Sequence, residues 1–139
     1  MPKDFWINLP VADVARSRAF FEAIGFGSEG AGDGAGMGAL RLGEKGLMVM
    51  LVPHERFAHF AGSAVADAAA GAEVMISFDA ASRDEVDALP ARVVAAGGTV
   101  FAEPTEIEGW MYGAGFADPD GHRWNILHMD PARMPGRPA

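Results

Sequence analysis

The chain has 139 residues, half of them hydrophobic, with a net charge of −8 and no cysteine. This length suits one domain, or two small halves that share a core. The acidic balance disfavours a nucleic-acid backbone as a partner, and a chain without cysteine has no disulfide, thiolate metal site or cysteine nucleophile.

Hydropathy places the chain among non-membrane proteins. No uninterrupted apolar run approaches the roughly 18 residues that span a bilayer, and the first residues lack the apolar region of a signal peptide. We therefore expect a cytoplasmic protein with no membrane partner.

The first half of the chain predicts a strand, a helix and a hairpin. Asp13 can cap the helix, and Gly25 stands where a left-handed residue would end it. A possible short helix at 54–60 opens the connector that follows. The expected elements before it are a strand at 5–11, a helix at 13–24, a glycine-rich loop at 27–38, and strands at 37–42 and 47–52.

The second half predicts the same outline. Ser82 and Glu85 have the spacing of a capping box, and Pro90 predicts a kink or a late start of the helix. Residues 118–121, Asp-Pro-Asp-Gly, fit a type I turn before the last strand. The expected elements are a strand at 73–79, a helix at 82–97, and strands at 99–103, 109–117 and 123–129.

The two halves are related by a repeat. Asn8 and Ser77 lie 69 positions apart, as do the two helix caps, and Met50 and Asn125 lie 75 apart in the last strand of each half. A duplicated unit that cannot bury its own sheet must pack on its partner. We therefore predict one domain built from a first module at 4–53, a linker at 54–71, a second module at 72–130 and a tail at 131–139.

Five segments, in this order, resemble the vicinal oxygen chelate superfamily, which contains the glyoxalase, bleomycin-resistance and extradiol dioxygenase proteins. The likeness is strongest to its bacterial branch of predicted lactoylglutathione lyases. It implies an α+β fold in which two βαβββ modules form a curved mixed sheet around a cleft, and it implies a homodimer. The segments are INLPVAD at 7–13, GF at 25–26, VMLV at 49–52, GWMYG at 109–113 and FADPDGHRW at 116–124.

The resemblance also implies where a metal would bind. In metal-bearing members, His, Glu or Gln side chains at four strand positions hold a divalent ion, and these positions correspond to Asn8, Met50, Ser77 and Asn125. Family members carry Glu directly after the Gly-His-x-Trp segment, where this chain has Asn125. Amides, a hydroxyl and a thioether supply no charge to hold a hard ion. We therefore expect no cofactor, with a divalent metal disfavoured.

The same positions are candidates for ligand binding. Polar side chains in otherwise apolar strands must find partners, so they either bond to each other and to water or line a pocket. Trp110 and Tyr112 lie where the resemblance brings a loop and a strand over the cleft, although ordinary core packing would also explain them. The predicted ligand-binding residues of the cleft are Asn8, Met50, Ser77, Trp110, Tyr112 and Asn125.

Other conspicuous side chains receive plainer interpretations. Glu103 and Glu106 would serve as a general base only if they were desolvated, and His128 can titrate near neutral pH. A further group is expected in the core: Trp6, Met48, Met75, Trp124 and Met129.

Two functions are compatible with these features. The first is a module that binds a small organic ligand in the cleft without the usual divalent metal, which requires only apolar walls and a few polar anchors. The alternative is a metal-dependent lyase or dioxygenase of the same superfamily with an atypical ligand set. If the protein has any activity, we expect it to be of the glyoxalase-like lyase type, and no catalytic residue can be named.

Overall fold

The computed structural model describes residues 1–28 and 36–136 of the chain. It divides into two compact units, residues 1–71 and 72–139. Within the described residues, no helix is long and apolar enough to cross a membrane.

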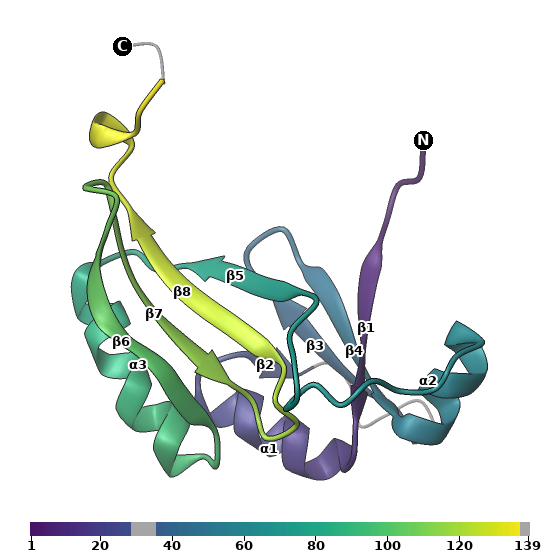
Figure 1. Ribbon diagram of the computed structural model, residues 1–139. Helices are drawn as coiled ribbons and strands as arrows, with labels where there is room; N and C mark the ends of the chain where they lie inside the picture. The colour runs from purple at the N-terminus through teal and green to yellow at the C-terminus, as the bar shows by residue number, and fades with distance from the viewer. Residues whose placement is uncertain (29–35, 137–139) are drawn as a thin grey trace. The chain divides into compact units, whose positions relative to one another are not determined.

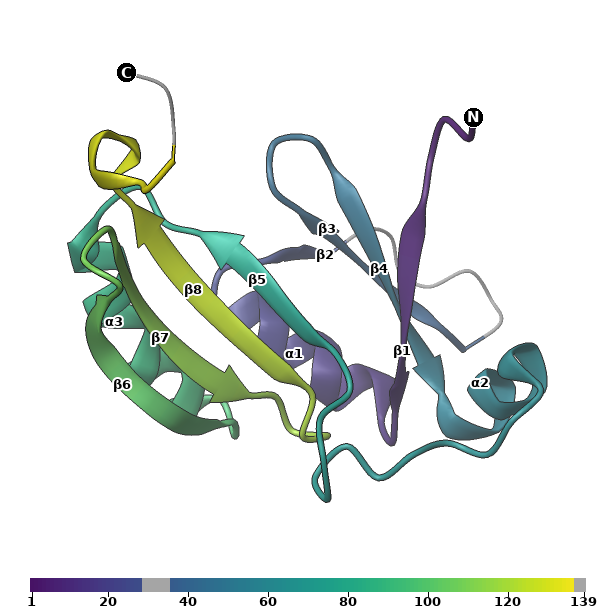
Figure 2. The ribbon, with the colours of Figure 1, turned by 45° about the horizontal axis from the view of Figure 1, so that its top comes forward.

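The first unit is a four-stranded mixed sheet with the strand order β1-β4-β3-β2 (Figure 1). β1 and β4 run parallel, and the remaining neighbours run antiparallel (Figure 2). The elements are β1 (Trp6–Val11), α1 (Val14–Ala23), β2 (Gly27–Ser28), β3 (Gly38–Leu42), β4 (Leu47–Pro53) and α2 (His54–Ala61).

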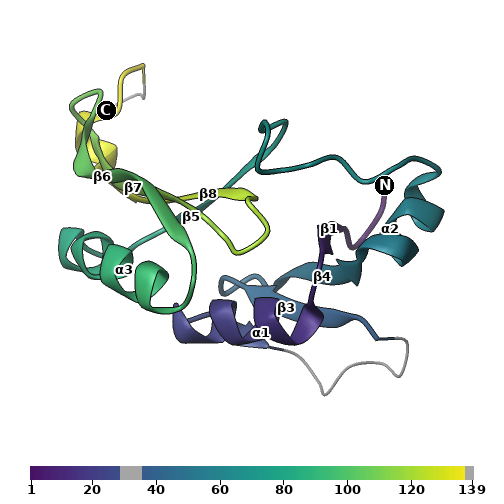
Figure 3. The same cartoon turned by 60° about the horizontal axis from the view of Figure 1, so that its bottom comes forward.

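Helix α1 covers one face of this sheet (Figure 3). The carboxylate of Asp13 accepts a hydrogen bond from the backbone N–H of Arg16, which is the cap that the sequence predicts. The helix ends before Gly25, whose φ of 106° favours glycine. Phe20 and Phe21 are fully buried and meet edge to face, with ring centroids 5.1 Å apart, and they anchor the helix in the core of the first unit.

The second unit repeats this topology with the strand order β5-β8-β7-β6 (Figure 1). β5 and β8 run parallel, as β1 and β4 do. Its elements are β5 (Met75–Asp79), α3 (Arg83–Ala95), β6 (Thr99–Ile107), β7 (Met111–Ala117), β8 (Arg123–Met129) and a short 3-10 helix, η1 (Pro131–Arg133). The fold is therefore α+β with two βαβββ modules, each a four-stranded mixed sheet, and this prediction is confirmed.

Helix α3 begins at the predicted capping box. The hydroxyl of Ser82 accepts a hydrogen bond from the N–H of Glu85 at 3.2 Å. The Glu85 carboxylate reaches back one residue further than in the standard box and accepts from the N–H of Ala81 at 2.9 Å. The predicted late start at Pro90 is wrong, because one helix runs from Arg83 past Pro90 to Ala95.

Three aromatic rings form the core between α3 and its sheet. Phe78, Phe116 and Trp124 come from β5, β7 and β8, and their ring centroids are 6.2–6.4 Å apart. Phe116 and Trp124 are buried, which confirms the prediction of a core position for Trp124. These rings mark the helix-covered face of the second sheet.

The predicted turn before β8 is present and is tied to the core. The N–H of Gly121 donates to the carbonyl oxygen of Asp118 at 2.9 Å, and Gly121 has a φ of 92°. The Asp118 carboxylate accepts hydrogen bonds from the N–H groups of Asp120 and His122 and from Nε1 of Trp124. Burial of this carboxylate raises the pKa of Asp118, and His122 and the three hydrogen bonds oppose that effect.

Two strand assignments differ from the sequence prediction. Gly27 and Ser28, expected in a loop, form the short edge strand β2, while residues 29–35 of that loop lie outside the described residues. β6 continues to Ile107, beyond the predicted end at residue 103 and through Pro104. β6 is an edge strand with register shifts, a position where a residue without an N–H is tolerated.

Candidate functional site

The open face of the first sheet, opposite α1, carries Asn8 and Met50. Successive residues of a strand point to opposite faces, and the neighbours Leu9 and Leu51 are buried. Leu51 lies on the side of α1, because its Cδ1 and Val14 of α1 both lie within 3.4 Å of where a Cβ on Gly38 would be. Asn8 and Met50 are register partners across the parallel strands β1 and β4. The first sheet therefore places these two predicted site residues side by side.

A pocket of about 740 Å³ lies on this open face within the first unit. Its lining includes Asn8 and Met50, the next register pair Trp6 and Met48, and Phe60 of α2. A pocket of this volume, with mostly apolar walls and a few polar groups, can enclose a small organic molecule. The expected core position of Trp6 is wrong, because its side chain is 57% exposed on this face.

The open face of the second sheet, opposite α3, carries Ser77 and Asn125. These residues are register partners across the parallel strands β5 and β8, in the same arrangement as Asn8 and Met50. Trp124 and Ile126 are buried on the helix-covered face, so Asn125 between them points to the open face. The repeat predicted from sequence spacing thus appears as two equivalent register pairs.

The side-chain oxygen of Asn125 has an unusual environment. Oδ1 is buried, and no hydrogen-bond partner for it is present among the described residues. Nearly all buried polar atoms in proteins have a partner, and an unpaired one costs about 1–3 kcal/mol. Asn125 Oδ1 is therefore positioned to accept a hydrogen bond from a group that these residues do not supply.

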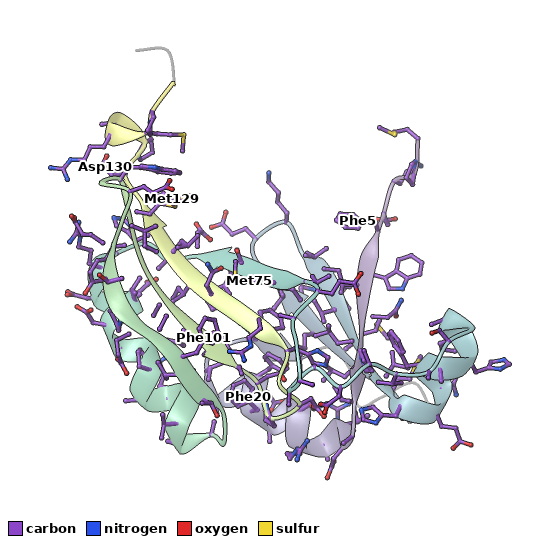
Figure 4. All side chains as sticks on the ribbon, viewed as in Figure 1. Phe5, Phe20, Met75, Phe101, Met129 and Asp130 are labelled. Carbon is purple, nitrogen blue, oxygen red and sulfur yellow. The ribbon has the colours of Figure 1, made fainter. Side chains whose placement is uncertain are left out.

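Phe101 lies over the second sheet (Figure 4), against Gly115 of β7. A Cβ atom on Gly115, the register partner of Asn125 on β7, would lie 2.5 Å from Cε1 of Phe101. The Arg123 guanidinium lies over the Phe101 ring, 4.6 Å from its centroid. Because residue 115 is glycine, the Phe101 ring can pack directly on β7 beside the register position of Asn125.

Two methionines that the sequence predicted in the core are exposed in the structure. Met75 and Met129 are 54% and 39% exposed, and both alternate with less exposed residues so that they share the open face of the second sheet (Figure 4). Met75 and Met129 thus add apolar surface to the face that carries Ser77 and Asn125.

Tyr112 lies on the other side of the second sheet. Its hydroxyl donates to the carboxylate of Asp87 on α3 at 2.5 Å, and the Arg83 guanidinium lies 4.6 Å from its ring centroid. The hydrogen bond to Asp87 is the main cause of the raised pKa of Tyr112. Tyr112 therefore shares the helix-covered face with Phe116, and the structure does not bring it together with Asn125.

Trp110 occupies the turn between β6 and β7. The N–H of Asp130 donates to its carbonyl oxygen at 2.8 Å, which ties this turn to the end of β8. Trp110 and Tyr112 line a smaller pocket of about 290 Å³, together with His128 and Arg133. Nδ1 of His128 is 3.0 Å from the carbonyl oxygen of Ala80, so a backbone contact holds this ring.

Glu106 does not have the environment of a general base. Its carboxylate is paired with Arg83, and both side chains are half exposed. The hydrogen bond from Arg83 lowers the pKa of Glu106, whereas a carboxylate base working near neutral pH needs a raised pKa. Glu103, the second candidate, is exposed on the edge strand β6.

The structure therefore sorts the six predicted site residues into three pairs. Asn8 and Met50 are adjacent in the first unit, Ser77 and Asn125 are adjacent in the second, and Trp110 and Tyr112 share the smaller pocket. The last pair does not lie on the open face of its sheet.

The donor set at the four positions that the resemblance assigns to metal ligands does not fit a catalytic divalent ion. Asn8 and Asn125 offer amide oxygens, Ser77 a hydroxyl and Met50 a thioether, and none is charged. In residues 1–28 and 36–136, no cluster of three or more His, Cys, Asp or Glu side chains could hold a metal ion. These residues therefore support no reaction step through a metal.

Sequence reasoning missed two cationic residues of the first pocket. Arg41 of β3 and Lys45 of the β3–β4 turn both belong to its lining. Arg41 is the register partner of Met48, so strand alternation places it on the same open face. The hairpin prediction contained this signal, because a cross-strand pairing assigns faces once the turn is known.

Comparisons with known proteins agree with this architecture. The hypothetical protein SA1046 from S. aureus is 34% identical, with a TM-score of 0.82, over 92% of this chain and 94% of that chain. A glyoxalase/bleomycin resistance protein/dioxygenase family enzyme from Burkholderia phytofirmans PsJN is 21% identical, with a TM-score of 0.75, over 89% and 96%.

A third similar structure holds a metal and a ligand. It is a mutant of the fosfomycin resistance protein FosX from Listeria monocytogenes, complexed with Mn(II) and dihydroxypropylphosphonic acid. It is 20% identical, with a TM-score of 0.66, over 91% of this chain and 90% of that chain, and at this identity the likeness concerns the fold alone.

The sequence itself has a match at the level of the family. No curated protein matches the chain. Residues 5–126, however, match a family that is described as the Glyoxalase/Bleomycin resistance protein/Dioxygenase superfamily. This match extends from the start of β1 into β8 and includes both register pairs. The chain therefore belongs to the Glyoxalase/Bleomycin resistance protein/Dioxygenase superfamily.

Proposed function

We propose that the protein binds a small organic ligand on the open face of its sheets and does so without a divalent metal. The observation that carries the proposal is the pocket of about 740 Å³ in which Asn8 and Met50 lie side by side. Apolar walls would hold the body of the ligand, and the Asn8 amide would orient it through a hydrogen bond.

The second register pair supports the same function. Asn125 Oδ1 is buried without a partner in the described residues, and it faces away from α3 beside Ser77. A ligand group that donates a hydrogen bond to Oδ1 would remove the cost of this unpaired acceptor. We therefore propose Ser77 and Asn125 as ligand-contacting residues of the second unit.

The side chains at the key positions do not suit the chemistry of a lactoylglutathione lyase, although the sequence resembles that branch. That chemistry moves a proton on a carbon next to a carbonyl and relies on a metal to stabilise the enediolate. The chain has Asn125 where family members carry Glu, and Met50 at the equivalent position of the first module. We propose that this protein keeps the scaffold of the branch and does not turn over the hemithioacetal of methylglyoxal and glutathione.

We also propose that the protein is a homodimer. Phe5 just before β1 and Met75 and Phe101 on the second open face are each exposed by 45% or more (Figure 4). Each unit therefore leaves large apolar side chains uncovered, and a second copy of the chain could cover them. Native mass spectrometry tests this, and a monomer at micromolar concentration would contradict it.

The uncharged fluorescent probe phenylnaphthylamine tests the proposed pocket. Met50→Trp would fill the pocket and weaken probe binding by about tenfold or more. Val94→Trp is the matched control, because Val94 is exposed on α3 and lines neither pocket. Equal binding by the two variants, with the fold checked by circular dichroism, would contradict the proposal, and so would turnover of the hemithioacetal.

A further inference from the structure

Cationic side chains gather at the first pocket of an acidic protein. Among the described residues that line it, the charged ones are two cations, Arg41 and Lys45, and one anion, Asp4, whereas the whole chain has a net charge of −8. The negatively charged protein repels anions as a whole. Cationic side chains at the pocket raise the local concentration of anions there.

The position of Arg41 is set by the turn that follows it. A Cβ atom at Gly46 would lie 2.5 Å from Nη1 of Arg41, so the guanidinium lies against the turn backbone where a side chain would otherwise be. Gly46 also has a φ of 73°, which favours glycine. The turn thus holds the guanidinium close to Lys45 at one end of the pocket.

The apolar part of the pocket is continuous with this cationic end. Trp6, Met48 and Arg41 are consecutive register partners across β1, β4 and β3, so they form one row on the open face. Asn8 and Met50 form the next row. A flat ring resting on Trp6 and the methionines would therefore place a substituent at Arg41 and Lys45.

We infer that the ligand of this pocket is an amphiphilic organic anion. Its carboxylate, sulfonate or similar group binds between Arg41 and Lys45, and its aromatic or aliphatic body lies on Trp6, Met48 and Met50. A guanidinium forms charge-assisted, often bidentate, hydrogen bonds with planar anionic groups. The inference rests on the proposed function and specifies the class of ligand that the site takes.

Two dyes with the same aromatic body separate the contribution of the anionic group to binding from that of the apolar body. Anilinonaphthalene sulfonate differs from phenylnaphthylamine only by its sulfonate. Arg41→Gln and Lys45→Gln are each expected to weaken binding of the sulfonate dye by about tenfold and to change binding of the uncharged dye less than about twofold. Asp4→Asn is expected to act in the opposite direction and to strengthen binding of the sulfonate dye alone.

A matched control and a salt series complete the experiment. Arg92→Gln removes the same charge from an exposed position of α3 outside both pockets and should change neither dye. Raising the salt concentration should weaken only the sulfonate dye, because screening acts on the exposed charges at the pocket end.

The outcomes separate the two proposals. If Arg41→Gln affects both dyes equally, affects neither, or matches Arg92→Gln, the anionic ligand class is wrong. In that case the proposed ligand-binding function is still supported, provided that Met50→Trp weakens binding of the uncharged dye. If Met50→Trp weakens the binding of neither dye, the proposed function is wrong, and the inferred ligand class is wrong with it.

Discussion

Asn125 lies directly beside Ser77 across two parallel strands, in the same register relationship that joins Met50 to Asn8 in the other half of the chain. The two pairs occupy the positions that the superfamily resemblance assigns to metal ligands, and here all four side chains are neutral. The same register pairing thus occurs in each unit, while these four side chains lack the charge that a metal site requires.

Replacing Asn125 by Leu should not destabilise the protein. Oδ1 is already buried without a partner in the described residues, so an apolar side chain with the same branching at Cγ removes a desolvation cost. We expect the free energy of unfolding to stay constant or rise by about 1 kcal/mol, while ligand binding on that face is lost. Urea denaturation measures the change, and a loss of more than about 1 kcal/mol would indicate that Oδ1 has a partner.

Replacing Asp118 by Ala should be among the most damaging single changes in the second unit. Three donors, including the indole of Trp124, would lose a buried acceptor. We expect a loss of about 2–4 kcal/mol in the free energy of unfolding. Asp118→Asn keeps one acceptor oxygen and should lose less. Equal losses for the two variants in urea denaturation would contradict this account.

The pH dependence of stability should also depend on Asp118. Burial is the main cause of its raised pKa, so the folded protein retains this proton to a higher pH than the unfolded chain. The stabilisation is complete below the ordinary aspartate pKa of about 4 and is lost as pH rises through the raised value. The wild-type protein should therefore gain stability relative to Asp118→Asn as pH falls from about 7 towards about 4. A gain in the opposite direction would mean that hydrogen bonds, and not burial, dominate this pKa.

Two glycines of β7 should respond differently to alanine. At Gly113 a Cβ atom would lie 2.7 Å from the backbone oxygen of Ile126, which cannot move without breaking the sheet. At Gly115 it would meet the ring of Phe101, which is 45% exposed and can swing away. We expect Gly113→Ala to cost about 2–3 kcal/mol and Gly115→Ala about 1 kcal/mol. Thermal unfolding of both variants checks the order, and a reversed order would contradict it.

Tyr112 should contribute to stability and not to binding. Tyr112→Phe removes an exposed hydrogen bond to Asp87 and should lower the free energy of unfolding by less than about 1 kcal/mol. Because Tyr112 faces α3, the affinity for phenylnaphthylamine should be unchanged. A clear loss of affinity would restore Tyr112 to the ligand site that the sequence predicted.

The fold could be predicted from the sequence because the signals were local and occurred twice. The caps at Asp13 and Ser82 and the turn at Asp118 each have a defined hydrogen-bond pattern, and all three are present. The spacing of Asn8 and Ser77 then indicated the repeat. The continuation of β6 through Pro104 could not be predicted, because it depends on β6 being an edge strand.

The site was predictable only in part. Strand alternation could have placed Tyr112 on the face of Phe116, since an even number of positions separates them along one strand. The exposure of Trp6 was not predictable from its apolarity, because it depends on whether another element covers that face of β1. Arg41 required the register of the hairpin, which links it to Met48.

The metal content of the purified protein tests the central claim most directly. After dialysis against a chelator and return to buffer containing Mn, Fe, Ni and Zn, elemental analysis should find far less than one ion per chain. Stoichiometric metal in the wild-type protein would contradict a metal-free function.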